Sequence, residues 1–397
     1  MGVAAHIIKA MESSSAIRKA FEDGLKLKKQ FGEKNVYDFS LGNPDLEPPV
    51  EVENIIKKIA SSGEKGAHAY MPNAGYMETR AAMAEKVSSE QGVKVGADGV
   101  VMAVGAAGAL NVIFKAILEP GDEVIVPAPF FAEYTHYCAN HGGKLVPVNT
   151  KDDFSLDMDA VANALSAKTA AVLINSPNNP TGKIYSEADI KALAKLLEAH
   201  AKKGRKPYII ADEPYRAITY GGKKVSALFP FYDAAIVASS FAKNLSLPGE
   251  RIGYLAINPA CPDKDELFAA CVFATRVLGY VNAPAFFQKV VAQAWNVPVD
   301  YSSYSKRRDA LMKVLKDAKI EFAEPEGAFY LFCKVPARKS DGCTDENLFC
   351  DFLKEYRILA VPGTGFGKKG WFRLAYCVSE DTITNSADSF IQAGKNW

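Results

Sequence analysis

The sequence predicts an α/β protein with a large, doubly wound and mostly parallel sheet domain and a smaller α+β domain. Two patterns lead to this fold class. Between residues 99 and 257, short runs rich in β-branched residues alternate with helical patterns, which is typical of βαβ units in a parallel sheet. After about residue 290, longer helical patterns mix with short strands, which indicates a second, smaller domain.

The elements follow from these patterns in chain order. The expected strands of the large sheet are 99–104, 123–127, 144–148, 169–175, 207–212, 234–239 and 252–257. Helices are expected between several of them, for example at 108–118 and 186–203. In the later part, helices are expected at 304–318 and 347–356, and strands at 329–335 and 371–377.

The first 45 residues form helical and then extended patterns. They are too few to form a domain alone, so we expect them to pack on the C-terminal part. This organisation gives a large domain at 46–290 and a small domain made of 1–45 and 291–397.

Length and composition exclude several classes of protein. A chain of 397 residues suggests two or three domains, at roughly 100–200 residues per domain. Hydrophobic residues make up 48% and charged residues 23%, which rules out wholesale disorder, collagen and a coiled coil. The 47 Lys and Arg against 46 Asp and Glu leave a net charge of +1. That balance gives no electrostatic reason to expect nucleic acid or a membrane surface as partner.

The cysteines and the hydropathy pattern indicate a cytoplasmic protein. The seven cysteines are odd in number, scattered and free of any Cys-x-x-Cys pair, and the five histidines do not cluster. Neither a disulfide framework nor a metal site is therefore expected. The N-terminus lacks an apolar signal core, and the most apolar stretch, 100–118, contains Asn111 and Lys115. We therefore expect no membrane span.

Four unusual segments stand at the ends of expected strands. They are 105–108 after the first strand, 176–182 after the fourth, 212–215 at the end of the fifth and 239–243 after the sixth. In an open α/β sheet, ligands bind outside the carboxyl ends of the strands. The four segments are therefore expected to converge on one crevice.

Each segment allows a chemical and a structural interpretation. The small residues at 105–108 open a helix and suit a phosphate, but they also let a helix pack closely on a sheet. They match neither the dinucleotide fingerprint nor the P-loop, which disfavours those readings. Asp212 would be costly to bury without a cationic partner, or it lies on the surface in a turn. A desolvated Lys243 would be a Schiff-base nucleophile with Arg251 near an anion, whereas an exposed Lys243 would simply be solvated.

The motifs together resemble the fold-type I, pyridoxal phosphate (PLP)-dependent aminotransferases of class I/II, the aspartate aminotransferase-like group. The resemblance runs from Leu41 to about Ala375. It is carried by Leu41-Gly-Asn-Pro-Asp45, Tyr70 with Gly75 and Arg80, Pro120-Gly-Asp-Glu-Val124, Asn178-Asn-Pro-Thr-Gly182, Asp212-Glu-Pro-Tyr215, Ser240-Phe-Ala-Lys243, Arg251-Ile-Gly253, Arg307-Arg-Asp309, Gly327-Ala-Phe-Tyr330, Pro362-Gly363 with Phe366-Gly367, and Arg373-Leu374.

The resemblance implies roles for the residues around the cofactor ring. Lys243 would form the internal aldimine with PLP and then shuttle a proton between the substrate α-carbon and C4′. Asp212 would pair with the pyridine nitrogen, which makes the ring an electron sink. Tyr215 and Asn179 would bind the ring's 3-oxygen, and Phe131 would stack on the ring unless it is a core aromatic beside its neighbour.

The resemblance also assigns the phosphate. The amides of Ala106 and Ala107, the Ser240 hydroxyl and the Arg251 guanidinium would hold it. Tyr70 would reach it from the neighbouring subunit, which implies a homodimer with shared active sites. Related proteins often carry a hydroxyl residue in this loop and at position 242, where this chain has alanines, so we expect somewhat weaker PLP binding.

For the substrates, the resemblance implies an L-amino acid and a 2-oxo acid. Arg373 would clamp the α-carboxylate, with Asn179 beside it, and Gly42 would let the backbone approach closely. We expect aspartate or a broad range of amino acids as donor and 2-oxoglutarate as acceptor. Arg276 would read a side-chain carboxylate, with Arg18 as the other candidate and a solvent-facing helix position as the alternative for Arg276.

Other PLP chemistry shares these motifs. A C–S β-lyase or a cyclopropane-carboxylate synthase would also carry Lys243, Asp212 and Arg251. A PLP-sensing regulator is expected less, because it needs a preceding helix-turn-helix domain and a basic footprint. Only about 40 residues precede Leu41 here.

Overall fold

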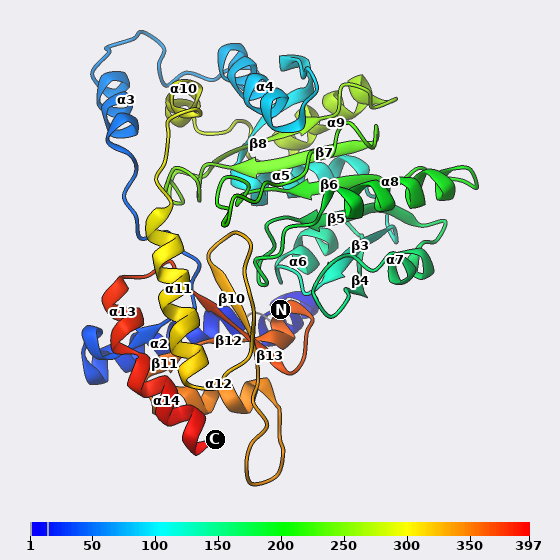
Figure 1. Cartoon of the computed structure of the whole chain (residues 1–397). Helices are drawn as coiled ribbons and strands as arrows, with labels where there is room; N and C mark the ends of the chain where they lie inside the picture. The colour runs from blue at the N-terminus through cyan, green and yellow to red at the C-terminus, as the bar shows by residue number, and fades with distance from the viewer. Residues whose placement is uncertain (1, 14–15) are drawn as a thin grey trace.

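The computed structural model describes residues 2–13 and 16–397 (Figure 1). A large sheet with helices on both faces occupies one half of the molecule. The N-terminal segment, drawn in blue, lies together with the C-terminal elements, drawn in orange and red, in the other half. The long helix α11 (Ser302–Asp317) follows the last elements of the first half and leads into the second.

The large sheet has seven strands in the order β2-β8-β7-β6-β5-β3-β4. They are β2 (Val100–Val104), β3 (Glu123–Ala128), β4 (Lys144–Asn149), β5 (Thr169–Asn175), β6 (Tyr208–Asp212), β7 (Ala235–Ser240) and β8 (Ile252–Ile257). β8 is antiparallel to both of its neighbours, and the remaining pairs are parallel. The predicted fold class is therefore confirmed, and the bounds of the seven strands differ from the expected ones by at most one residue.

Helices cover both faces of this sheet and bury it completely at its centre, where all seven residues of β5 are buried. One face carries α5 (Gly105–Ile117), α6 (Tyr134–Ala139) and α9 (Lys264–Val277). The other carries α3 (Val50–Ala60), α4 (Met77–Gln91), α7 (Met158–Ala164), α8 (Glu187–Ala201) and α10 (Ala285–Ala294). Side chains of a strand alternate between the faces, so Ile209 and Ala211 join the α4 face and Ile210 the α5 face.

Helix α5 begins three residues earlier than the pattern predicted, at Gly105 instead of residue 108. Gly105 has φ +68°, a left-handed conformation that glycine adopts without strain, so the chain turns directly from β2 into the helix. Ala106 and Ala107 therefore lie in the first helical turn rather than in a loop.

The C-terminal part is built on a second, four-stranded antiparallel sheet in the order β12-β13-β10-β9. Its strands are β9 (Phe322–Ala323), β10 (Tyr330–Lys334), β12 (Val361–Pro362) and β13 (Trp371–Ala375). Besides α11, the helices of this part are α12 (Glu346–Glu355), α13 (Glu380–Asn385) and α14 (Ala387–Asn396). Short 3₁₀ turns in the described chain are η1 (Glu33–Asn35), η2 (Ala97–Gly99) and η3 (Gly363–Phe366).

The N-terminal segment consists of α1 (Ala5–Ser13), α2 (Ala16–Phe31) and the short strand β1 (Tyr37–Asp38). β1 pairs in parallel with β11 (Ile358–Leu359), and the amide of Ala375 donates to the carbonyl of Phe39 at 2.8 Å. The start of the chain is thus joined to the C-terminal part by backbone hydrogen bonds. Among the helices of residues 2–13 and 16–397, none combines the length and the apolar character that a membrane crossing requires.

Candidate active site

A cavity of about 280 Å³ opens at the carboxyl ends of β5, β6 and β7 and faces the C-terminal part. The four segments singled out in the sequence all contribute to its wall, as the positions of the strand ends predicted. Of the residues expected at the site, eleven line the cavity: Gly42, Ala106, Ala107, Phe131, Asn179, Asp212, Tyr215, Ser240, Lys243, Arg251 and Arg373.

Asp212, the last residue of β6, is a buried carboxyl group, so the alternative of a surface position in a turn is wrong. The hydroxyl of Tyr134 donates to its Oδ2 at 2.6 Å. Oδ1 is buried and has no hydrogen-bond partner among the described residues. Burial raises the pKa of Asp212 to about 7, while the bond from Tyr134 acts in the opposite direction. One oxygen of the carboxyl group is therefore free to bind a ligand that carries a proton.

Tyr134 was missed at the sequence level. It is the first residue of α6 and is buried, and its ring packs edge-on against Phe131, with centroids 5.5 Å apart. The only available signal was the spacing of two aromatic residues three apart. That spacing does not show that the phenol meets a carboxylate from another strand.

Lys243 follows β7 and extends its amine across the cavity. Nζ donates to the carbonyl of Gly42 at 2.6 Å and lies 5.6 Å from the centre of the Phe329 ring. Burial, together with the positive charges of Arg373 and Arg251, lowers the pKa of Lys243 to about 8. Near neutral pH the lysine is therefore much closer to its nucleophilic, uncharged form than an exposed lysine.

Arg373, on β13, is buried at the side of the cavity formed by the C-terminal part. Its Nη1 donates to Asn179 Oδ1 at 3.0 Å and its Nη2 to the carbonyl of Ser40 at 2.5 Å. The rings of Tyr330 and Phe366 lie 4.6 Å and 4.8 Å from its guanidinium carbon. Nη1 and Nη2 are held in a fixed orientation, and a guanidinium held in this way suits a carboxylate.

Two tyrosines and a glycine complete the wall between Lys243 and Arg373. The hydroxyls of Tyr215 and Tyr330 are 2.8 Å apart, and burial raises the pKa of Tyr330 to about 12. A Cβ added to Gly42 would come within 2.0 Å of the Tyr330 hydroxyl, so a side chain cannot be accommodated here without movement. Tyr330 belongs to the motif at 327–330, but nothing in its sequence pattern predicted a place in the cavity.

The far end of the cavity forms a cradle for an anion. Ala106 and Ala107 present the N-terminal turn of α5, where backbone amides and the helix dipole favour negative charge. The Arg251 guanidinium lies close to the start of this helix, since a Cβ added to Gly105 would be only 2.9 Å from its Nη2. Ser240 adds a hydroxyl to the same wall.

Two expected site residues lie elsewhere in the single chain. Tyr70 is 89% exposed and does not contribute to the cavity. Arg276 is exposed in the last turn of α9 and lies over the ring of Phe273, 5.5 Å from its centre. The side chain of Arg18, the other candidate, lies outside the described part of the chain.

The arrangement suits a flat, phosphate-bearing aldehyde with a basic ring nitrogen. The unpartnered oxygen of Asp212 can accept a hydrogen bond from the protonated nitrogen, the start of α5 and Arg251 can hold the phosphate, and Lys243 can reach the aldehyde. Over residues 2–13 and 16–397, no group of three or more His, Cys, Asp or Glu side chains is placed to hold a metal ion.

The chain is similar to known proteins along nearly its whole length. The family model for aminotransferase class I and II matches residues 34–390. The aspartate aminotransferase of Thermotoga maritima is 32% identical over 362 residues, which are 89% of this chain and 90% of the relative. An amino transferase of known structure from Eubacterium rectale superposes with a TM-score of 0.94 at 40% identity, over 100% of this chain and 99% of the other. The Thermus thermophilus aspartate aminotransferase with maleate gives a TM-score of 0.87 at 29% identity, over 99% and 100%.

Proposed function

Because the chain belongs to the class I and II aminotransferase family, we propose roles in that chemistry for the residues of its cavity. The protein is a PLP-dependent enzyme that transfers an amino group between an amino acid and a 2-oxo acid. The observation that supports the assignments most directly is the buried Oδ1 of Asp212, which has no partner within the described chain and lies in the wall of a cavity lined by Lys243.

We propose that Lys243 is the covalent attachment point of the cofactor. PLP, when bound, accepts the amino group of the donor and withdraws electrons from its α-carbon. The lysine amine, with its pKa lowered to about 8, is then the base that takes the proton from that carbon and returns it to the cofactor side. The carbonyl of Gly42, which accepts from Nζ, holds the amine at the substrate side of the cavity.

We propose further roles for the groups around the cofactor ring. Asp212 keeps the ring nitrogen protonated, and Tyr134 fixes the orientation of that carboxylate. Tyr215 and Asn179 bind the ring oxygen, and Phe131 provides an aromatic face. In the cradle, Ala106, Ala107, Ser240 and Arg251 hold the phosphate.

We also propose a homodimer with shared active sites, in which Tyr70 reaches the phosphate of the partner's cavity. Tyr70 lies on a segment anchored to the body of the protein, since Asn282 Nδ2 donates to the carbonyls of Met71 and Pro72. Large apolar side chains are exposed on α4 and α9, namely Met77 (61%), Phe273 (57%) and Val277 (48%). An anchored but highly exposed tyrosine, in a chain that also exposes such apolar side chains, fits a site that is completed by association.

We also propose a domain division and a cellular location for the enzyme. The large domain comprises 46–290 and the small domain 1–45 with 291–397, which is supported by the separate sheets and cores of the two parts. The enzyme is cytoplasmic, which is supported by its seven cysteines, all free and six of them buried.

The substrates are aspartate or a broad range of L-amino acids, with a 2-oxo acid such as 2-oxoglutarate as acceptor. Arg373 and Asn179 bind the α-carboxylate next to Gly42. The basic residues of the cavity wall are Lys243, Arg251 and Arg373, and each already has an assigned partner. None of the described residues of the cavity wall is thus left to bind a side-chain carboxylate, and we propose Arg276 of the other subunit for this role, with Arg18 as the other candidate.

The donor preference is tested with Arg276→Ala. We expect kcat/KM for aspartate to fall at least tenfold, while kcat/KM for alanine, which has no side-chain carboxylate, stays within about twofold. Equal kinetics for aspartate in both enzymes would remove Arg276 from the site and leave the aminotransferase assignment intact.

The reaction itself is tested by absorbance of the purified enzyme with PLP. Aspartate should convert the spectrum of the bound cofactor to that of the amine form, and 2-oxoglutarate should restore it. Lys243→Ala should retain no cofactor after borohydride reduction and denaturation, whereas the wild-type enzyme should retain it. Cofactor retained by Lys243→Ala would show that another residue is the attachment point.

A further inference from the structure

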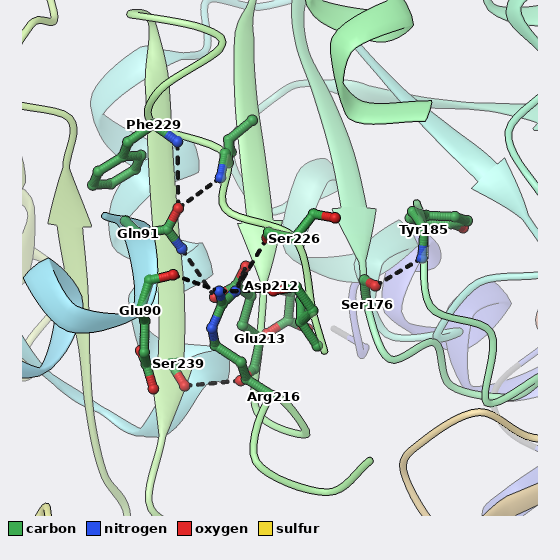
Figure 2. A network of polar contacts seen from close by, with 12 residues as sticks. Glu90, Gln91, Ser176, Tyr185, Asp212, Glu213, Arg216, Ser226, Phe229 and Ser239 are labelled. Carbon is green, nitrogen blue, oxygen red and sulfur yellow. Dashed lines mark hydrogen bonds and ion pairs between the residues drawn. The ribbon is translucent and has the colours of Figure 1, made fainter. Parts of the chain in front are cut away.

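A buried ion pair lies directly behind Asp212, on the opposite face of the sheet from the cavity. Because side chains alternate along an extended chain, Asp212 faces α6 and the next residue, Glu213, faces α4. Arg216 Nη1 contacts Glu213 Oε1 at 2.8 Å, and the two side chains are only 11% and 4% exposed (Figure 2). The proposed function gives neither residue a role.

Arg216 fixes the pair to two neighbouring segments of the backbone. Its Nη2 donates to the carbonyl of Glu90, near the end of α4, at 2.7 Å and to the carbonyl of Val225 at 3.1 Å. Its Nη1 also donates to the carbonyl of Ser226 at 3.4 Å. These bonds use the fork of the guanidinium in several directions at once, which a lysine amine cannot reproduce.

Glu213 is held just as closely. Gln91 Nε2 approaches its Oε2 at 3.5 Å, while Gln91 Oε1 accepts from the amides of Leu228 and Phe229. On the main chain, the carbonyl of Glu213 accepts from the Ser239 hydroxyl at 3.0 Å. The glutamate is thus anchored through both its side chain and its peptide group (Figure 2).

The ion pair spans the short turn that carries the two cofactor-binding side chains of this segment. Asp212 precedes Glu213, and Tyr215 precedes Arg216, so each end of the pair is adjacent to one of them. Burying two opposite charges costs desolvation that their attraction barely offsets, so such a pair is a poor source of stability. What it does provide is a fixed geometry between positions 213 and 216.

We propose that Glu213 and Arg216 form a positioning pair that sets the relative placement of Asp212 and Tyr215 at the cofactor ring. This inference rests on the proposed function, because it presumes that those two side chains bind the ring. The pair contacts neither cofactor nor substrate. It acts through the backbone of the turn, which it ties to the end of α4 and to the segment at 225–229.

The test separates positioning from stability. Arg216→Met leaves a buried carboxylate without its partner and should lower the thermal unfolding temperature. The double variant Glu213→Gln/Arg216→Met removes both charges and should recover most of that loss. If the pair positions the turn, the double variant still binds PLP at least tenfold more weakly than the wild type and shows a displaced absorbance maximum of the bound cofactor. Wild-type PLP affinity and spectrum in the double variant would overturn the proposal.

Two further variants keep the test decisive. Arg216→Lys keeps the charge but loses the fork, so the protein should fold and bind PLP more weakly than wild type. Unchanged binding would count against the proposal even if the methionine variants fail to fold.

The matched control is Asp122→Asn/Arg205→Met, which removes a partly buried pair with a 2.6 Å contact near the amino ends of the strands. It should lower stability without changing PLP affinity. Absence of PLP binding by the wild type would instead contradict the proposed function.

Discussion

Replacing Tyr134 by phenylalanine removes one hydroxyl and leaves the ring contact with Phe131 in place. The lost atom is the donor to Asp212 Oδ2 at 2.6 Å, which is the one hydrogen bond to this carboxyl side chain found in the described chain. We expect the variant to fold and its affinity for PLP to fall, because the carboxylate that should hold the ring nitrogen loses its support.

The structure sets the size of this effect. A hydrogen bond to a charged group contributes about 1.5–3 kcal/mol, and about 1.4 kcal/mol corresponds to a factor of ten. The Kd for PLP should therefore rise roughly 10–100-fold at pH 7. Burial already raises the pKa of Asp212 to about 7, and loss of the Tyr134 bond raises it further. Since the bound state needs the ionised carboxylate, the penalty should be greater at pH 6 than at pH 8.

The assay is a spectroscopic PLP titration of the apoenzyme at both pH values. Tyr232→Phe is the matched control, because the Tyr232 hydroxyl donates to the carbonyl of Pro207 at the same distance of 2.6 Å, at the other end of β6. The control should lose stability and keep its PLP affinity. If Tyr134→Phe binds PLP as tightly as the wild type, or if the control weakens binding equally, the reasoning about Asp212 is refuted.

Three other variants test the remaining walls of the cavity. Burial lowers the pKa of Lys243 from 10.5 to about 8, so keeping the amine protonated in the folded protein costs about 3 kcal/mol at pH 7. Its hydrogen bond to the Gly42 carbonyl offsets about 1 kcal/mol of this cost. Lys243→Met should therefore stabilise the apoprotein by about 2 kcal/mol in denaturant unfolding at pH 7. Arg373→Lys keeps the charge but loses the fork, so kcat/KM for amino donors should fall roughly 10–100-fold while PLP affinity stays unchanged. Gly42→Ala would press a methyl group against Tyr330 and should cost about 1–3 kcal/mol of stability and raise KM, whereas Gly204→Ala, which meets nothing within 4 Å, should be neutral.

Each of these has a result that contradicts it. For Lys243→Met, the gain must shrink as pH rises from 8 to 10.5, because there the folded wild type has already released the proton that its unfolded state still binds. A gain independent of pH would point to packing instead of charge. An equal loss of PLP affinity in Arg373→Lys would place that arginine at the cofactor, and a normal KM in Gly42→Ala would show that the backbone has room to move.

The sequence predicted the strands well because their signal is local. Runs such as Thr169–Asn175 and Ile252–Ile257 are mostly apolar, and every residue in them is buried, as expected for strands covered on both faces. The antiparallel direction of β8 could not be predicted from the sequence, because it depends on pairing with β2, which lies far away along the chain. The start of α5 was misplaced because the left-handed turn at Gly105 replaces a loop with an immediate helix.

In the candidate site, too, the residues with a local sequence signal were predicted and those that depend on distant contacts were not. Its cavity-lining residues follow strand ends or recognisable motifs, so their convergence could be inferred. Tyr134 and Arg216 could not, because each meets its partner only once a short segment has been folded against the sheet. Tyr70 and Arg276 are both exposed in the single chain, and their proposed roles depend on a second subunit.

The pairing of β1 with β11 imposes an order on how the enzyme is completed during its synthesis. By the time residue 257 has left the ribosome, all seven strands of the large sheet have been made, together with Asp212, Lys243 and Arg251. Gly42 was made long before, but its segment is held by elements near the C-terminus, as is Arg373. A nascent or truncated chain therefore contains the residues proposed to hold the cofactor well before Arg373 is made, and its N-terminal segment stays without its strand partner for nearly the whole of translation.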